Sequence, residues 1–345
     1  MPTKADIRAE GARLQAGFLA AGAMPVDPDI LLPAETLLDL YGEDIRARAY
    51  VTSDPLRGEQ MLRPDFTVPV VQDHIARAAG PARYTYSGEV FRQQENDPSR
   101  ASEYLQVGFE RFGGEVSEAD AEVFALVTEA LVGLPVRPVV GDIGLLIAAV
   151  SGLTTSERRK AALMRHIWRP ARFRSMVARF SRPAKVREVA TTTAPHVGLR
   201  SEAEIAERLS ILADEAAQPP LPGAEARFID ALLSIKGPVP EAAEALKSLG
   251  NASIREAVAL FADRLSALEA RGTDLWTLHF EASYGRSLME YYDGFVFGFQ
   301  PKEPGATPVA TGGRYDALTR VLGQGRAVPA VGAVIRPGLT LELRT

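Results

Sequence analysis

Hydrophobic and polar positions follow two different periods along the chain, and these periods divide it into three stretches. Residues 1–145 combine helical and strand periods, residues 146–271 follow a helical period almost throughout, and residues 272–345 return to strand signals. In the first stretch, Ile7, Leu14 and Phe18 fall on one helical face, which predicts an amphipathic helix over residues 4–22. The pattern therefore predicts a helical block, residues 146–271, between two parts rich in strands.

Residues 83–112 contain the clearest strand pattern. Two strand-like runs flank the polar segment Gln93–Ser102, which predicts an antiparallel hairpin with a long loop. Residues of matching parity on the two strands share one face. That face contains Tyr84, Tyr86, Gly88, Arg92, Gln106, Gly108 and Glu110. Two glycines that leave space between tyrosine, amide, carboxylate and arginine groups could accept a small zwitterion, but the same pattern also fits a solvated sheet face.

Helix-start signals and apolar stripes organise the rest of the chain. A Ser followed three positions later by an acidic residue predicts a capped helix start, and it occurs at Ser117/Asp120, Ser201/Glu204 and Ser253/Glu256. Two stripes at helical spacing predict buried faces, one made of Ile205, Leu209 and Leu212, the other of Ile254, Val258, Phe261, Leu265 and Leu268.

Strand signals resume after Gly272, and we predict strands over residues 275–281 and 289–299. A Pro- and Gly-rich connection then leads to Thr311. The pattern alone favours neither a separate central domain nor a helical block inserted into one discontinuous sheet domain.

Composition excludes several kinds of chemistry. The 345 residues include no Cys, so disulfide frameworks, thiolate zinc sites and Cys nucleophiles are ruled out. The four His are scattered without metal-ligand spacing, and we expect no metal and no cofactor. No apolar run approaches the ~18 residues that a membrane span needs. We therefore expect a mature cytoplasmic protein with no membrane partner.

Charge is distributed unevenly along the chain. The net charge is −5, which disfavours sequence-independent binding to nucleic acid. Residues 156–188, however, hold eleven basic and two acidic side chains, a net charge of +9. Trp168, Phe173 and Phe180 lie among them, and this combination fits either RNA contact or helices with an apolar inner face and a basic outer face. We favour the second interpretation, a solvated face or protein interface.

Six short motifs follow one another along the chain. They are Leu62-Arg-Pro-Asp-Phe-Thr67, Tyr86-Ser-Gly-Glu-Val-Phe-Arg92, Leu105-Gln-Val-Gly-Phe-Glu110, Met289-Glu-Tyr-Tyr292, Gly312-Gly-Arg-Tyr-Asp316 and Pro329-Ala-Val-Gly332. Their order and spacing resemble the catalytic core of the histidyl-tRNA synthetase family. Ile30-Leu-Leu-Pro-Ala-Glu35 is similar to that family's dimer-forming first motif.

The resemblance implies an α+β fold: a class II aminoacyl-tRNA synthetase-like antiparallel sheet flanked by helices. It also implies that residues 1–145 and 272–345 form one core, that residues 146–271 are a helical insertion, and that no anticodon-binding domain follows. By motif match, seven residues would bind histidine. They are Asp65 (Glu in the family), Thr67, Arg92, Gln106, Glu110, Tyr291 and Tyr292.

Departures from the synthetase pattern fall on the groups that handle ATP. Gly338 and Leu339 occupy the positions of the third motif's Glu-Arg pair, and we expect Pro337 to disturb the helix start. Ser287 occupies the position of the catalytic Arg of the histidine motif, with Arg286 one place away. Adenylation requires cations on the phosphates, so ATP handling is compromised.

A retained amino-acid pocket without these cations resembles the ATP phosphoribosyltransferase regulatory subunits, a family of truncated synthetase relatives. The resemblance implies a non-catalytic partner of a short-form catalytic subunit, with L-histidine as ligand, a homodimer within a hetero-oligomer, and no tRNA. The main alternative is a histidine-activating enzyme that forms an adenylate for a non-tRNA acceptor. Its ATP site would draw on Arg92, Gln94 or Glu95, Arg100, Arg286 and Arg314. An RNA-binding relative that uses the basic segment is a third hypothesis.

Overall fold

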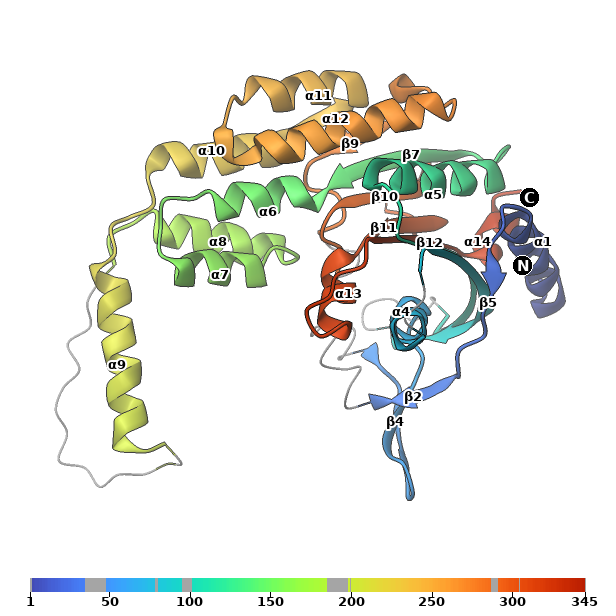
Figure 1. The fold of residues 1–345 in the computed structure, drawn as a ribbon, viewed down its shortest axis with the longest axis horizontal. Coiled ribbons are helices and arrows are strands. Elements are labelled where there is room, and N and C mark those ends of the chain that lie inside the picture. Colours follow the sequence, from blue (N-terminus) through green and yellow to red (C-terminus); the bar gives the residue numbers. More distant parts are fainter. Residues whose placement is uncertain are drawn as a thin grey trace.

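The computed structural model describes residues 2–34, 48–77, 80–94, 101–184, 198, 200–286, 291–303 and 305–344. In these ranges the chain forms a nine-stranded mixed sheet, a three-stranded sheet and helices that pack around them (Figure 1). This architecture confirms the α+β fold class.

The strands lie as follows. Those of the large sheet are β1 Met24–Pro25, β5 Ala82–Phe91, β6 Glu103–Phe112, β7 Val136–Asp142, β8 Lys236–Pro238, β9 His279–Glu281, β10 Phe295–Pro301, β11 Ala310–Arg314 and β12 Ala330–Ile335. Those of the small sheet are β2 Leu31–Pro33, β3 Val51–Asp54 and β4 Gly58–Leu62.

The helices divide between the core and the helical block. Those of the core are α1 Lys4–Ala20, α4 Thr67–Ala76, α5 Val116–Ala130, α13 Asp316–Leu322 and α14 Pro337–Glu342. The later ones, from the end of β7 to the return of the chain to the sheet, are α6 Ile143–Ser151, α7 Glu157–Arg165, α8 Pro170–Phe180, α9 Glu202–Ala217, α10 Gly223–Ser234, α11 Val239–Ser248 and α12 Arg255–Ala270, with short 3₁₀ turns at Ala252–Ile254 and Leu275–Thr277.

The large sheet has the strand order β1-β5-β6-β12-β11-β10-β7-β9-β8. Its pairings are antiparallel except β1 with β5 and β7 with β9. The helical block joins β7 to β9, which are neighbours in the sheet, and from within the block the short strand β8 adds to the sheet edge beside β9. The division proposed at residues 145 and 271 stays a prediction, and its first boundary falls within α6.

The two faces of the sheet have different coverings. On one face, the α1 side chain Phe18 contacts Phe109 of β6, with ring centroids 5.4 Å apart. On the other face, His74 of α4 stacks on Phe112 and its Nδ1 lies 3.1 Å from the hydroxyl of Tyr84. Helices α4 and α13 lie together on this second face (Figure 1), which is the face that carries Gln106 and Glu110.

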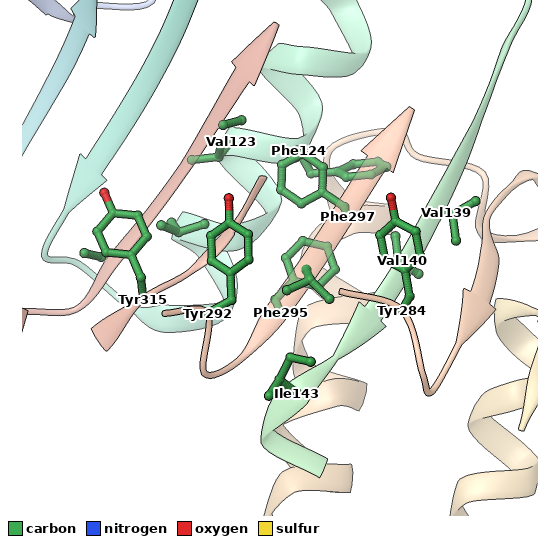
Figure 2. Close-up of a cluster of buried hydrophobic side chains, with 14 of the residues drawn as sticks. Val123, Phe124, Val139, Val140, Ile143, Tyr284, Tyr292, Phe295, Phe297 and Tyr315 are labelled. Carbon is green, nitrogen blue, oxygen red and sulfur yellow. The ribbon is translucent and has the colours of Figure 1, made fainter. Parts of the chain in front are cut away.

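Aromatic rings fill the core beneath α5. The Phe124 ring lies 5.2 to 6.3 Å from the rings of Phe295, Phe297 and Phe299, which alternate along β10 (Figure 2). All four side chains are buried. Alternation along one strand and helical spacing on α5 therefore bring these rings together in a tightly packed core.

The helical block carries the two predicted stripes, and only one of them is buried. The α12 stripe is confirmed, because Ile254, Phe261, Leu265 and Leu268 are buried. The prediction for α9 is wrong: Ile205, Leu209 and Leu212 are 36 to 52% exposed. Helix α9 stands away from the rest of the block (Figure 1), so no described part of the chain covers its apolar face.

Two of the three predicted capping boxes are wrong. Ser201 and Glu204 do cap α9. Helix α5 begins instead at Glu115, whose carboxylate accepts hydrogen bonds from the backbone N–H groups of Ser117 and Glu118. Near Ser253 and Glu256, a 3₁₀ turn capped by Asn251 comes before α12. Asp120 is thus available for a different role, described below.

Both predicted strands after Gly272 begin later than expected. The side chain of Asp274 accepts a hydrogen bond from Trp276 N–H, and this turn delays the first strand to His279. The second strand begins at Phe295, and residues 287–290 lie outside the described residues. In the ranges that the structure covers, no helix is long and apolar enough to span a membrane.

Candidate functional site

A cavity of about 270 Å³ opens on the face of the sheet that carries Gln106. Six of the seven residues predicted to bind an amino acid line it: Asp65, Thr67, Arg92, Gln106, Tyr291 and Tyr292. The seventh, Glu110, is buried next to the lining, where its carboxylate accepts a hydrogen bond from Thr67. The volume is just below the ~300–1,000 Å³ usual for ligand pockets, which suits a small ligand.

The pairing of β5 with β6 confirms that the residues of matching parity share one face, although Arg92 lies opposite Ser102 at the end of the hairpin. Gly88 pairs with Gln106, and Tyr84 pairs with Glu110. The two glycines, however, do not leave space for a ligand. A Cβ at Gly108 would lie 2.1 Å from the Tyr86 ring, and one at Gly88 would lie 2.5 Å from the guanidinium of Arg63. The chain's own side chains occupy both spaces.

Glu110 lies at the centre of a buried hydrogen-bond network. Its carboxylate accepts hydrogen bonds from the hydroxyls of Thr67 (2.9 Å), Tyr86 (2.9 Å) and Tyr315 (2.5 Å). Gly332 on the neighbouring strand β12 makes room for it, because a Cβ there would overlap the carboxylate. Burial raises the pKa of Glu110 to about 7, although the three hydroxyls lower it.

Gln106 presents a buried polar atom at the cavity. The side chain is 1% exposed, and among the described residues its Oε1 has no hydrogen-bond donor within reach. A buried acceptor without a donor costs roughly 1–3 kcal/mol. Oε1 is itself enclosed, so a ligand N–H group would satisfy it once the amide turns towards the cavity.

Hydrogen bonds to residues outside the cavity lining hold Arg92 and Tyr292 in place. Arg92 Nε donates to the carbonyl of Pro64 (2.7 Å), and its backbone N–H donates to Ser102 (2.8 Å). The indole N–H of Trp168, from the loop between α7 and α8, donates to the carbonyl of Tyr292 (3.2 Å). Burial and the carboxylate of Glu110 raise the pKa of Tyr292 well above its usual range, so its hydroxyl remains a donor.

Two arginines of the alternative ATP-site hypothesis are engaged elsewhere. The Nε of Arg286 donates to the carbonyl of Ile167 (2.6 Å), and its guanidinium lies over the Phe173 ring. Arg314 is 3% exposed and pairs with Asp120 and Asp316 (2.7 and 2.9 Å). Gln94 donates to two backbone carbonyls. Glu95 and Arg100 lie outside the described residues.

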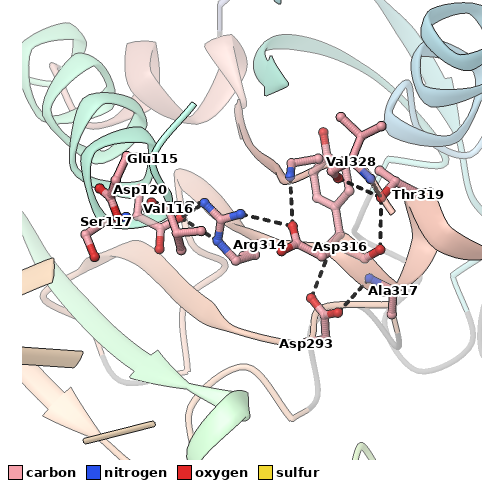
Figure 3. A network of polar contacts seen from close by, with 12 residues as sticks. Glu115, Val116, Ser117, Asp120, Asp293, Arg314, Asp316, Ala317, Thr319 and Val328 are labelled. Carbon is pink, nitrogen blue, oxygen red and sulfur yellow. Dashed lines mark hydrogen bonds and ion pairs between the residues drawn. The ribbon is translucent and has the colours of Figure 1, made fainter. Parts of the chain in front are cut away.

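Arg314 belongs to a buried ion cluster and donates to Asp120 of α5 and to Asp316 (Figure 3). Asp120 also accepts a hydrogen bond from Arg264 of α12, and Arg264 donates to Asp142 at 2.7 Å. The carboxylate of Asp293 accepts from the backbone N–H groups at the start of α13, and burial with the nearby Asp316 charge raises its pKa to about 6. The cluster holds the residues that flank Tyr292 and Tyr315.

The region after β12 differs from expectation. Pro337 occupies the first turn of α14, where its missing N–H is tolerated, so it does not disturb the helix start. Leu339 packs partly buried against the core. Arg336, which precedes the helix, lines the cavity and donates to the carbonyl of Pro308 (2.9 Å).

Among the charged and aromatic residues that line the cavity, sequence reasoning missed three, Arg48, Tyr315 and Arg336. A signal existed for Arg336, because it has the same strand parity as Gly332, which pairs with Glu110. A signal existed for Tyr315 in its motif, but its hydroxyl's contact with Glu110 depends on strand pairing across the sheet. We find no signal for Arg48.

The chain is similar to known proteins over nearly its whole length. A family model described as histidyl-tRNA synthetase matches residues 2–337. ATP phosphoribosyltransferase regulatory subunits of Mesorhizobium japonicum and Agrobacterium fabrum are each 32% identical over 91% of this chain and cover 92% and 91% of their own lengths.

Two solved structures share the fold. The ATP phosphoribosyltransferase regulatory subunit/histidyl-tRNA synthetase from Bacillus halodurans has a TM-score of 0.73 at 22% identity, and the match covers 99% of this chain and 79% of that chain. A histidine–tRNA ligase subunit from Alicyclobacillus acidocaldarius has a TM-score of 0.62 at 23% identity, covering 100% and 94%.

The sheet, the hairpin cavity and the family model together define a protein of the histidyl-tRNA synthetase type, built on the class II core. The relatives identify one family within this class, because regulatory subunits match at 32% identity along almost the entire chain. The chain belongs to the family of ATP phosphoribosyltransferase regulatory subunits, as its motifs predict.

Proposed function

We propose that this chain regulates a short-form ATP phosphoribosyltransferase catalytic subunit, at the first step of histidine biosynthesis in the cytoplasm. The transferase chemistry belongs to the partner, and this chain converts histidine availability into a change of partner activity. One observation carries the proposal: six of the seven residues predicted to bind histidine line one cavity, whereas Arg286 and Arg314 are buried in contacts away from it.

L-histidine fits the groups that line the cavity. Arg92 would meet the ligand's carboxylate, and Gln106 with Asp65 would accept hydrogen bonds from its ammonium or imidazole N–H groups. Glu110 would act through the hydroxyls of Thr67 and Tyr315, which line the cavity. Tyr291 and Tyr292, whose rings meet edge to face at 5.1 Å, would line the imidazole. Histidine can regulate only if it binds the active and inhibited assemblies with different affinity, typically by ~1–3 kcal/mol.

The assembly we propose is a homodimer of this chain within a hetero-oligomer. Exposed apolar side chains of the small sheet and the segment before it support the dimer, since Ile30, Leu31 and Val51 are 45 to 48% exposed. Leu31 and Val51 lie on opposite faces of that sheet, because they pair with the successive residues Leu62 and Met61.

Reconstitution tests the proposed function. The purified chain is mixed with a short-form catalytic subunit, and sedimentation velocity measures association while a turnover assay is run with and without histidine. We expect a hetero-oligomer whose turnover depends on this chain and falls when histidine is added. A chain that neither associates with the catalytic subunit nor alters its turnover would refute the proposal.

Pyrophosphate exchange into ATP separates the regulator from the adenylate-forming alternative. We expect no histidine-dependent exchange, because the cations needed on the phosphates are absent or engaged. Leu339→Arg alone should not create exchange, since Ser287 also departs from the synthetase pattern. Exchange in the wild-type chain would support the enzyme instead.

A further inference from the structure

Helices α7 and α8 carry a surface that is strongly positive. Six exposed arginines belong to it: Arg158, Arg165, Arg172, Arg174, Arg179 and Arg182. We call them the α7–α8 basic surface. Within the described residues 156–184, Glu157 is the one acidic residue, and Lys160 pairs with it at 2.9 Å. Arg158 lies 4.0 Å from the carboxylate of Glu215 on α9. Cations therefore outnumber anions on this surface, while the chain outside residues 156–188 carries a net charge of −14.

The aromatic residues of this segment point inward. Phe173 and Phe180 are 1% and 8% exposed, and both belong to the core. Trp168 is half-buried, and its N–H is bonded to Tyr292. Stacking of bases on aromatic side chains is a main source of affinity for single-stranded nucleic acid. These three rings do not provide it, which removes the strongest argument for RNA.

The spacing of the arginines suits extended contact with carboxylates. Arg158 and Arg165 are seven residues apart on α7, and Arg172 and Arg179 are seven apart on α8. Seven residues span about two helical turns, roughly 10 Å, so each pair lies along one helical face. Guanidinium groups bind carboxylates through paired hydrogen bonds. A carboxylate-rich protein surface would relieve the repulsion among these cations.

The loop between α7 and α8, together with Phe173 of α8, contacts Tyr292, which lines the cavity, and Arg286. Trp168 bonds to the carbonyl of Tyr292, and Arg286 bonds to the carbonyl of Ile167 and stacks over Phe173. A partner bound to the outer side of α7 and α8 and a ligand in contact with Tyr292 would therefore both bear on the segment formed by α7, α8 and the loop between them. A subunit that reports ligand occupancy to a partner needs such a connection.

We propose that the α7–α8 basic surface docks a carboxylate-rich surface of the catalytic subunit. This inference deepens the proposed function and rests on it, because the proposed function supplies the partner. It assigns the contact to the outer face of α7 and α8 and leaves the cavity to the ligand.

Charge reversal tests the assignment. The double variant Arg172→Glu/Arg179→Glu is compared with a matched control, Arg320→Glu/Arg326→Glu, whose arginines are exposed on and after α13. Circular dichroism and thermal unfolding confirm that both variants fold, and calorimetry measures histidine binding. We expect the α8 double variant to weaken association with the catalytic subunit at least tenfold, with histidine affinity within twofold of wild type. The control should associate like wild type.

The outcomes distinguish a failure of the proposed function from a failure of the docking assignment. If the wild-type chain fails to associate, the proposed function fails and this inference with it. If the wild-type chain associates and the α8 variant associates equally well, only the docking assignment is overturned. It is also overturned if the reversal leaves assembly unchanged but abolishes binding to a fluorescein-labelled single-stranded RNA, since the surface is then a nucleic-acid site.

Discussion

Glu110, buried next to the cavity lining, has a carboxyl group whose pKa is strongly changed by its surroundings. Three hydroxyl donors stabilise its charged form, but full burial outweighs them, and its pKa is raised to about 7. The carboxyl group therefore changes its charge near neutral pH. Because it lies beneath Thr67 and Tyr315, both of which line the cavity, the proton affects how the lining hydroxyls are oriented.

Glu110 should make the ligand-free chain less stable as pH rises. The folded state holds the proton between the unfolded pKa, about 4.5, and the folded value, about 7, so the stabilisation is complete below pH 4.5 and lost by about pH 7. We expect the free energy of unfolding, measured by urea titration, to fall by roughly 1–3 kcal/mol more in wild type than in Glu110→Gln across this window.

Asp293, whose pKa is also raised, has the same effect in both proteins and cancels in the comparison. Parallel stability curves for wild type and Glu110→Gln would contradict the raised pKa of Glu110.

Helices α9 and α12 show how an element's surroundings decide whether an apolar stripe is buried. Leu268 of α12 is 0% exposed, whereas Leu209 of α9 is 36% exposed. Helical spacing is equally good in both, and the packing of α12 against α5, α6 and α11 distinguishes them.

The two stripes should respond differently to truncation. We expect Leu268→Ala to cost about 2–5 kcal/mol of unfolding free energy, since it opens a cavity in the core. Leu209→Ala should cost less than about 0.5 kcal/mol, as is usual for surface positions. Chemical denaturation of the isolated chain measures both, and equal losses would mean that α9 is covered in solution.

The loop between α7 and α8 is the second element with a testable role. Trp168→Phe keeps an aromatic ring but removes the N–H that bonds to the carbonyl of Tyr292. We expect histidine affinity, measured by calorimetry, to fall about 3- to 30-fold, because a net hydrogen bond of this kind contributes roughly 0.5–1.5 kcal/mol or more when its acceptor is left buried. Trp276→Phe, at a side chain 65% exposed, is the control. Unchanged affinity in both would show that the loop does not position Tyr292.

Across the whole molecule, a buried ion cluster joins the helical block to the sheet. Arg264 of α12 is fully buried and bonds to Asp120 of α5 and Asp142 of β7. Asp120 also accepts a hydrogen bond from Arg314, the residue before Tyr315. Removing one member of such a cluster leaves a buried charge without a partner, so the block and the cavity depend on each other for stability.

Local signals predicted the hairpin and the buried stripe of α12, and the resemblance of the motifs to a known family named six residues that line the cavity. Strand parity predicted that Gln106 and Glu110 share a face with Tyr84 and Gly88. Local sequence signals gave wrong predictions where a residue's contacts come from parts of the chain that are far away in the sequence. Asp120 has the spacing of a cap residue but pairs with Arg264 and Arg314, which are 144 and 194 positions away. The space above Gly108 is likewise filled by a ring from the neighbouring strand.

The central claim is that this chain regulates its partner through histidine bound beside Gln106. Its most direct test is a histidine titration of transferase turnover in the reconstituted complex, with wild type and with Gln106→Ala. We predict that Gln106→Ala assembles normally but needs at least tenfold more histidine for half-maximal inhibition, because the cavity loses the buried acceptor that a ligand N–H would satisfy. An unchanged midpoint in an assembled complex would place the regulatory site elsewhere.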